Sequence, residues 1–181
     1  MLLCLRQIAN TLKGMNWIIL SGLAVKIYAY PDRKVNDIDI LISDWNEFVE
    51  ASKRFNTEIK ERSMDKQKFT TKDKGFDFVV NDIPVEITAG MWETNFKDFI
   101  STPKFDEEWL NHIQEKEFFG LKLKLQPLED LIVQKIAMNR QKDVKDLEHL
   151  IKLDIDKEFL LREAKNWNCY DKVVNYIEQV D

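Results

Sequence analysis

The stretch that decides the fold is WIILSGLAVKIYAYPDRKVNDIDILI, residues 17–42. Its first part, Trp17–Leu20, is a short apolar run that is typical of a buried strand. Ser21 and Gly22 interrupt the run and predict a tight turn, because glycine adopts backbone conformations that other residues avoid. A short helix over Leu23–Tyr30 is expected next, and the proline that follows it would end it.

This turn predicts a phosphate site. A helix that begins directly after Gly22 points the backbone N–H groups of its first turn at whatever lies beside Ser21. Unpaired N–H groups at a helix N-terminus bind phosphate well. We therefore expect Ser21 and Gly22 to hold the phosphates of a nucleotide.

Two acids form the second half of the stretch. Asp37 and Asp39 alternate with isoleucines in a predicted strand over Asp37–Ile42, so both carboxylates point to one face. Carboxylates this close repel each other, and Mg²⁺ relieves the repulsion, especially when substrate phosphates complete its coordination. The sequence therefore predicts that metal and phosphate meet at one place.

Taken together, these features resemble the nucleotidyltransferase superfamily related to DNA polymerase β. The motif of that superfamily is an apolar strand, Gly-Gly or Gly-Ser, a short helix, and Asp-apolar-Asp on the next strand. The corresponding segments here are IILSGLAV and RKVNDIDILI, with Ser21 in place of the usual first glycine. The resemblance implies an α/β (α+β) fold, with a mixed sheet flanked by helices, of the minimal antitoxin-like or drug-modifying branch.

Residues 66–89 change to the pattern of short strands. Turns are predicted at Lys74-Gly75 and at Asn81-Asp82, with the strand PVEIT after the second turn. This region is the expected source of a third acid.

Glu86 is the favoured third acid. It lies between two apolar residues in NDIPVEIT, the context in which the superfamily places this acid on a strand beside the other two. Asp77, between two phenylalanines, is the competing candidate. The resemblance implies that Asp37, Asp39 and Glu86 are both catalytic residues and metal ligands.

Arg33 precedes Asp37 by four residues and matches an arginine that is common in the nearest relatives of the motif. It would contact a phosphate or brace the acids through charge-assisted hydrogen bonds. A solvated loop arginine is the alternative.

The segment LEDLIVQKIAMNRQKDVKDLEHL, residues 128–150, resembles the helical segment that follows the catalytic domain in the antitoxin-like and drug-modifying branches. The resembling positions are Lys135, Arg140, Lys142, Asp143 and Asp146. Lys135 and Lys142 are candidates for binding the triphosphate, because a cation stabilises the charge that develops on the leaving pyrophosphate. Alternatively, these residues form a salt-bridged helix surface with pairs such as Lys142 and Asp146.

The remaining pattern predicts two parts, a catalytic domain over residues 1–125 and a helical extension over residues 126–181 packed on it. Helices are expected over residues 2–13 and 44–55, the first helix of the extension begins at Pro127 and the second at Lys142, and the last two cover residues 157–166 and 171–180. Residues 91–116 give no clear pattern. Their aromatic residues either anchor an irregular segment to the core or line an acceptor pocket; they are Trp92, Phe96, Phe99, Phe105 and Trp109.

Composition narrows the possible partners. The net charge of −5 and the pI near 5.2 argue against a protein that follows a long nucleic-acid backbone, which requires many Lys and Arg contacts. The sequence has no apolar run of the ~20 residues that a bilayer requires and no signal-peptide core. We therefore expect a cytoplasmic protein without a membrane span, acting on a small substrate or a folded partner.

The function implied by the resemblance is transfer of a nucleoside monophosphate from a nucleoside triphosphate to a hydroxyl. Two Mg²⁺ ions, or Mn²⁺ in their place, would position the triphosphate and activate the acceptor. The acceptor is a small molecule or a protein hydroxyl, and RNA is least favoured. The alternative is a catalytically weakened module that binds a nucleotide or a protein partner of the toxin type.

Overall fold

The computed structural model describes residues 1–65, 69–97, 99–102 and 104–180. The strands are β1 (Ile18–Ile19), β2 (Ile38–Leu41), β3 (Lys60–Asp65), β4 (Phe69–Val80), β5 (Ile83–Phe96), β6 (Ile100–Ser101), β7 (Gln114–Phe118) and β8 (Leu121–Leu125). The helices are α1 (Leu2–Thr11), α2 (Ser21–Tyr28), α3 (Trp45–Arg54), α4 (Glu107–Asn111), α5 (Leu128–Met138), α6 (Gln141–Leu150), α7 (Lys157–Asn166) and α8 (Tyr170–Val180).

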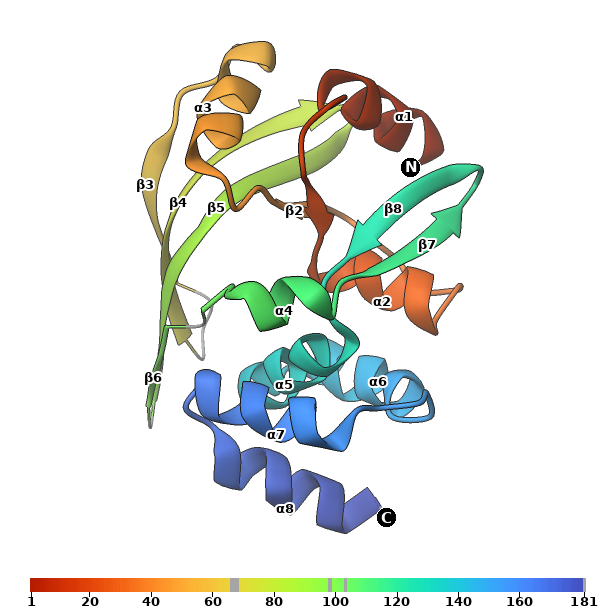
Figure 1. The fold of residues 1–181 in the computed structure, drawn as a ribbon, viewed down its shortest axis with the longest axis vertical. Coiled ribbons are helices and arrows are strands. Elements are labelled where there is room, and N and C mark those ends of the chain that lie inside the picture. The colour runs from red at the N-terminus through yellow and green to blue at the C-terminus, as the bar shows by residue number, and fades with distance from the viewer. Residues whose placement is uncertain (66–68, 98, 103, 181) are drawn as a thin grey trace.

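These strands form one mixed sheet, which confirms the predicted α/β class. The strand order is β3-β4-β5-β2-β1-β8-β7, with β6 paired to β5. β2 runs parallel to β5 and β1 parallel to β8, whereas the other pairs are antiparallel. Helices α5–α8 gather at one end of the molecule, while α1 and α3 lie at the opposite end (Figure 1).

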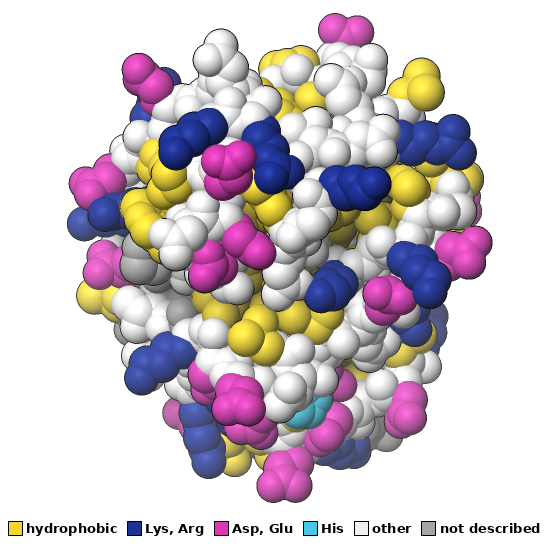
Figure 2. Space-filling view, turned by 45° about the horizontal axis from the view of Figure 1, so that its top comes forward, with side chains coloured by type: hydrophobic (Ala, Val, Ile, Leu, Met, Phe, Trp, Pro, Cys, Tyr) yellow, Lys and Arg dark blue, Asp and Glu magenta, His cyan; other side chains and the backbone are white. Residues whose placement is uncertain are grey.

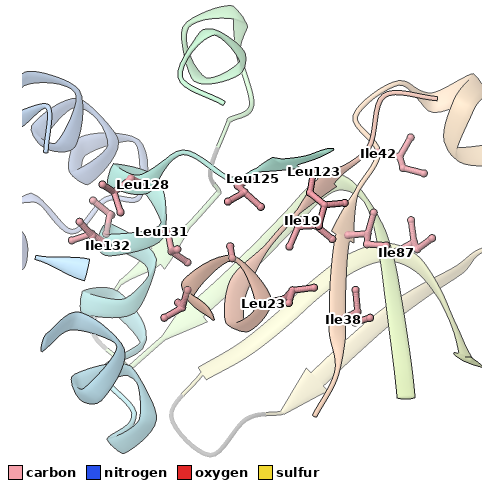
Figure 3. Packing of buried hydrophobic residues seen from close by; sticks show 14 of the residues in the cluster. Ile19, Leu23, Ile38, Ile42, Ile87, Leu123, Leu125, Leu128, Leu131 and Ile132 are labelled. Carbon is pink, nitrogen blue, oxygen red and sulfur yellow. The ribbon is translucent and has the colours of Figure 1, made fainter. Parts of the chain in front are cut away.

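A single hydrophobic cluster connects the sheet with the helices of the C-terminal part. It contains Ile19, Ile38 and Ile87 from central strands and Leu23 from α2. In Figure 3 the leucines of α5 lie on one side of the view and Ile38 and Ile87 on the other, with Leu23 between them. Because the cluster continues from residue 4 to residue 173, the C-terminal helices are packed on the sheet. A division of the chain at residue 125 stays a prediction.

Most predicted elements are present, but the region of short strands is not as predicted. There is no turn at Lys74-Gly75; β4 passes straight through it, with a register shift between Asp73 and Gly75. β5 continues as far as Phe96, and β3 was not predicted at all. Residues 66–68, where this region was expected to begin, lie outside the described part of the chain. The turn at Asn81-Asp82 is confirmed, with both residues at positive φ.

Helix α2 differs from the sequence prediction at both boundaries. It begins at Ser21 rather than at Leu23, and it ends at Tyr28 rather than at Tyr30. The helix predicted after Asp44 is confirmed as α3, and the Asp44 side chain accepts a hydrogen bond from the Glu47 N–H at 2.9 Å. The Glu47 carboxylate accepts a hydrogen bond from the Asn16 N–H at 2.8 Å. This bond links α3 to the loop before β1. No helix in the described residues has the length and apolarity needed to cross a bilayer.

Candidate active site

The structure brings Asp39 and Glu86 together on neighbouring strands. β2 and β5 are parallel and Asp39 is paired with Glu86 in their register, so the two side chains lie on one face at the ~4.8 Å spacing of adjacent strands. Asp37 precedes β2 and lines the same pocket, which has a volume of about 150 Å³. Three carboxylates from segments far apart in the chain therefore face one cavity.

Mutual repulsion marks Asp39 as the centre of this group. Burial, together with the negative charges of Asp37 and Glu86, raises the pKa of Asp39 to about 7. The Ser21 hydroxyl and the Lys135 charge act in the opposite direction and lower this pKa. A cation bound at Asp39 would relieve the repulsion, since a nearby positive charge favours the ionised form.

Asp77, the competing third acid, is paired with Glu86 from the other side, in the antiparallel register of β4 and β5. It is exposed and does not line the pocket. The arrangement therefore favours Glu86 over Asp77 as the third acid of the site.

The turn after β1 has the position that a phosphate-binding turn requires. Ser21 has a φ of 52°, in the left-handed region that glycine adopts more easily than serine. Its N–H donates to Gln126 Oε1 at 3.0 Å, so this amide is already engaged. The next two amides, of Gly22 and Leu23, come before the first N–H with a backbone partner at the start of α2, which is Ala24 N–H bound to the Leu20 carbonyl, so they are the ones open to a phosphate.

Gly22 has a second role, which is to make room for Arg33. A Cβ at position 22 would come within 3.0 Å of the Arg33 guanidinium. That guanidinium lines the pocket and binds Asp146 of α6 in bidentate fashion, with Nε–Oδ1 at 2.6 Å and Nη2–Oδ2 at 2.9 Å. Arg33 therefore ties the loop after α2 to α6, rather than bracing Asp37 and Asp39 as the sequence suggested.

Lys135 lies in the same buried ion cluster. It is only 1% exposed, and its ammonium is 3.2 Å from Asp143 Oδ1 and 3.1 Å from Asp146 Oδ2. Arg140 also binds Asp143, with Nε–Oδ2 at 2.6 Å. The positions that resemble the family segment are thus mostly bound to one another, although Lys135 and Arg140 also line the pocket.

Lys142 is different from Lys135. It is exposed at the pocket, and no ion pair joins it to a carboxylate in the described residues, so the suggested pair with Asp146 is not formed. Partial burial lowers the pKa of Lys142, and the neighbouring cations Arg140 and Lys135 lower it further. A bound anion would stabilise the charged ammonium of Lys142, so this residue is well placed to bind a phosphate.

Several polar pocket residues were missed by sequence reasoning, among them Arg62 and Gln134. Arg62 of β3 lies against the acids, and Gln134 of α5 has a buried side-chain oxygen without a hydrogen-bond partner among the described residues. Gln134 gave no signal because it stands beside Lys135 in an otherwise apolar helix. Arg62 could not be found because its strand was not predicted.

The aromatic residues of the region 91–116 that the structure describes do not line this pocket. Trp109 is fully buried and Phe105 packs on its edge, with 4.8 Å between ring centroids. Phe96 and Phe99 stack on each other. The side chain of Trp92 lies outside the described part of the structure. The others support the reading that they anchor an irregular segment to the core.

The carboxylates fit magnesium chemically, because carboxylate oxygens are among its preferred ligands. No group of three or more His, Cys, Asp or Glu side chains in the described residues is arranged to hold a metal ion by itself. In phosphoryl-transfer sites one or two carboxylates and the substrate phosphates usually share the Mg²⁺ ion.

Comparison with known families identifies the family of this chain. The sequence profile of the family described as nucleotidyl transferase of unknown function (DUF2204) matches residues 2–179. The chain belongs to this nucleotidyl transferase family. A search of curated proteins finds no match for this nucleotidyl transferase.

Solved structures show the same fold. A Thermotoga maritima protein assigned as a nucleotidyltransferase is 22% identical, with a TM-score of 0.58 over 81% of this chain and 89% of that chain. The enzyme ANT(2″)-Ia, solved with adenylyl-2″-tobramycin, is 13% identical, with a TM-score of 0.57 over 92% of this nucleotidyl transferase and 94% of that chain. The lincosamide antibiotic adenylyltransferase LnuA, solved with lincomycin, is 14% identical, with a TM-score of 0.51 over 84% and 96%.

Proposed function

We propose that this chain transfers a nucleoside monophosphate from a Mg²⁺-bound nucleoside triphosphate to a hydroxyl group. The observation that carries the proposal is the meeting of Asp37, Asp39 and Glu86 in one pocket with the turn at Ser21-Gly22. Family membership supports the reaction class.

The pocket has two walls of opposite character, which gives the nucleotide an orientation. The acids lie on the sheet, while Lys142 and Arg140 come from the α5–α6 side. The triphosphate would lie between them, with Gly22 N–H and the Lys142 ammonium binding its oxygens. Lys135, held by two buried carboxylates, contributes through its charge rather than by direct contact.

Asp37, Asp39 and Glu86 would hold magnesium, with Mn²⁺ as a substitute. The two ions expected from the sequence would neutralise the triphosphate and lower the pKa of the acceptor hydroxyl. Glu86, on the sheet side of the pocket, would orient that hydroxyl toward the α-phosphate and accept its proton. Positioning and charge stabilisation account for most catalysis in such transfers.

A small-molecule acceptor is favoured over RNA, and a protein hydroxyl stays possible. Two relatives of the same fold are described as an adenylyltransferase bound to lincomycin and an enzyme bound to adenylyl-2″-tobramycin. This is an analogy at the level of fold, and it points to ATP and to small acceptors without deciding either. Figure 2 shows acidic and basic side chains interspersed on one face of the molecule, which does not favour binding along an RNA backbone.

The alternative function is binding of a nucleotide, or of a protein partner of the toxin type, without transfer. One observation favours it: the Ser21 amide is bound to Gln126 instead of being free for a phosphate. Such a module would retain Mg²⁺-dependent nucleotide binding but would release no pyrophosphate.

Thermal melting with each of the four nucleoside triphosphates tests the proposal. A ligand at a hundred times its Kd stabilises the fold by about 2.7 kcal/mol, so the melting temperature should rise when Mg²⁺ is present. Asp37→Asn and Asp39→Asn should abolish the rise, whereas Asp77→Asn, an exposed acid outside the pocket, should keep it. Pyrophosphate release in the presence of cell extract separates an enzyme from a binding module. A protein that shows no rise with any nucleotide, with Mg²⁺ or Mn²⁺, lacks the proposed site.

A further inference from the structure

Arg62 is a charged pocket residue that the proposed reaction does not yet use. It belongs to β3 and crosses to β4, where Nε is 2.8 Å from Asp73 Oδ1 and Nη2 is 2.5 Å from Asp73 Oδ2. The side chains of Arg62 and Asp73 are 11% and 5% exposed, so this is a nearly buried bidentate ion pair. Such a pair fixes the guanidinium plane, because both parallel hydrogen bonds must be kept.

Strand β4 leaves room for the Arg62 guanidinium at Gly75. A Cβ at Gly75 would come within 3.0 Å of three guanidinium atoms of Arg62. The register of β4 with β5 also shifts between Asp73 and Gly75. Glycine and a bulge within a strand both weaken it, and they often mark a close approach or a side chain that is redirected.

The third guanidinium nitrogen points to the proposed site. Arg62 Nη1 is 3.7 Å from Glu86 Oε2, and both residues line the pocket. The negative charges of Asp73, Glu86 and Asp77 raise the pKa of Arg62 although its burial lowers it. Asp73 therefore holds the guanidinium on one side while its free edge faces the carboxylate of Glu86.

We propose that Arg62 is a positioning residue, which holds the Glu86 carboxylate in place beside Asp39 for the transfer reaction. This inference rests on the proposed function. A third of the Glu86 side chain is exposed, so without a fixed partner it can adopt several rotamers. Fixing it in the one rotamer that the reaction requires then costs conformational entropy. A guanidinium anchored by Asp73 removes part of that cost, as supporting residues do around metal ligands.

Arg62 could instead serve only the stability of the fold. A double variant separates this structural role from the positioning of Glu86. Arg62→Met leaves Asp73 buried and unpaired, so it should destabilise the fold whatever Arg62 does for Glu86. Adding Asp73→Asn removes that buried charge and should restore most of the stability. We expect the double variant Arg62→Met/Asp73→Asn to fold without the Arg62–Asp73 ion pair and without the contact with Glu86. Because Asp73 also lines the pocket, Asp73→Asn alone, which keeps Arg62 beside Glu86, is measured next to it.

The readout is the Mg²⁺ concentration that gives half of the melting shift caused by the best nucleotide, together with the rate of pyrophosphate release. In the double variant we expect a ten-fold or greater increase in the half-effective Mg²⁺ concentration and a 10- to 100-fold slower release. Arg62→Lys should also fail to restore the rate, because one ammonium cannot replace a planar fork that binds two carboxylates. Arg54→Met is the control: Arg54 binds Glu50 and the carbonyls of Thr11 and Lys13 and does not line the pocket, so this variant should match wild type in both readouts.

If the double variant recovers stability and also matches wild type in both readouts, Arg62 is structural and the inference is wrong. This result differs from failure of the proposed function, in which the wild-type protein itself shows no Mg²⁺-dependent shift.

Discussion

Replacing Lys135 and Lys142 by methionine, one at a time, should give opposite results. Methionine keeps a long unbranched side chain and removes only the charge. Lys135 is buried between Asp143 and Asp146, whereas Lys142 is exposed and has no ion pair in the described residues. We expect Lys135→Met to reduce stability and Lys142→Met to reduce nucleotide affinity.

The size of the stability loss follows from the ion cluster. Removing one partner of a buried ion pair costs about 3–5 kcal/mol, because it leaves a charge buried without compensation. Here Asp146 would still have Arg33 and Asp143 would still have Arg140, at 2.6 Å in each case. The loss should therefore lie near the lower end, at about 3 kcal/mol, which is roughly 6–12 °C in melting temperature for a chain of this size.

Equilibrium urea denaturation followed by tryptophan fluorescence measures this loss, since Trp109 and Trp167 are fully buried. Lys142→Met should stay within about 0.5 kcal/mol of wild type, as exposed substitutions usually do. It should instead weaken binding of the Mg²⁺-bound nucleotide by about ten-fold, the loss of roughly one charge-assisted hydrogen bond. If Lys135→Met is as stable as wild type, the buried cluster does not hold α5 and α6 together and our reasoning is refuted.

Three other substitutions test the remaining features. Ser21→Gly should raise the free energy of unfolding by about 1 kcal/mol, because glycine adopts the φ of 52° without strain; a loss of stability in urea denaturation would contradict this. Gly22→Ala should displace Arg33 from Asp146 and lower both stability and nucleotide-induced melting shifts. Gly120→Ala is the control for the shifts: its Cβ would meet no atom within 4 Å, and although the φ of 77° strains alanine and lowers stability, the shifts should stay as in wild type. Burial, together with the negative charge of Asp130, raises the pKa of Glu163 to about 7. The folded state therefore holds a proton that the unfolded chain releases, and wild-type stability should fall as pH rises from about 4.5 to 7. Glu163→Gln should flatten this fall by about 2 kcal/mol between pH 5 and pH 8, measured by denaturation at each pH; an unchanged slope would show that Glu163 is ionised in the folded protein.

The central part of the site could be predicted because it depends on local patterns. Asp37 and Asp39 were found through strand alternation, and Ser21-Gly22 through the turn between an apolar run and a helix. Glu86 needed the resemblance to a family, because its partner strand is more than forty residues away. The pairing of Asp39 with Glu86 in the register of β2 and β5 agrees with that choice.

The long ribbon of β3, β4 and β5 could not be predicted, and the reason is physical. Gly75 was interpreted as a turn residue because glycine most often serves that role. In the structure its missing side chain makes room for Arg62, thirteen residues earlier in the chain. A single sequence does not reveal which neighbour a glycine accommodates, so both the continuous strand and the guanidinium beside Glu86 were missed.

The two lysines of the C-terminal part show where a motif stops being informative. Lys135 and Lys142 stand seven residues apart, close to two helical turns, so by periodicity alone they were equivalent candidates for binding phosphate. The helix containing Lys135 ends at Met138 and Asn139 follows with a left-handed φ of 45°, which separates α5 from α6. This break turns Asp143 and Asp146 inward to Lys135 and leaves Lys142 at the pocket. The same residue type therefore supplies the buried charge that holds the two helices together and the open charge available to a nucleotide.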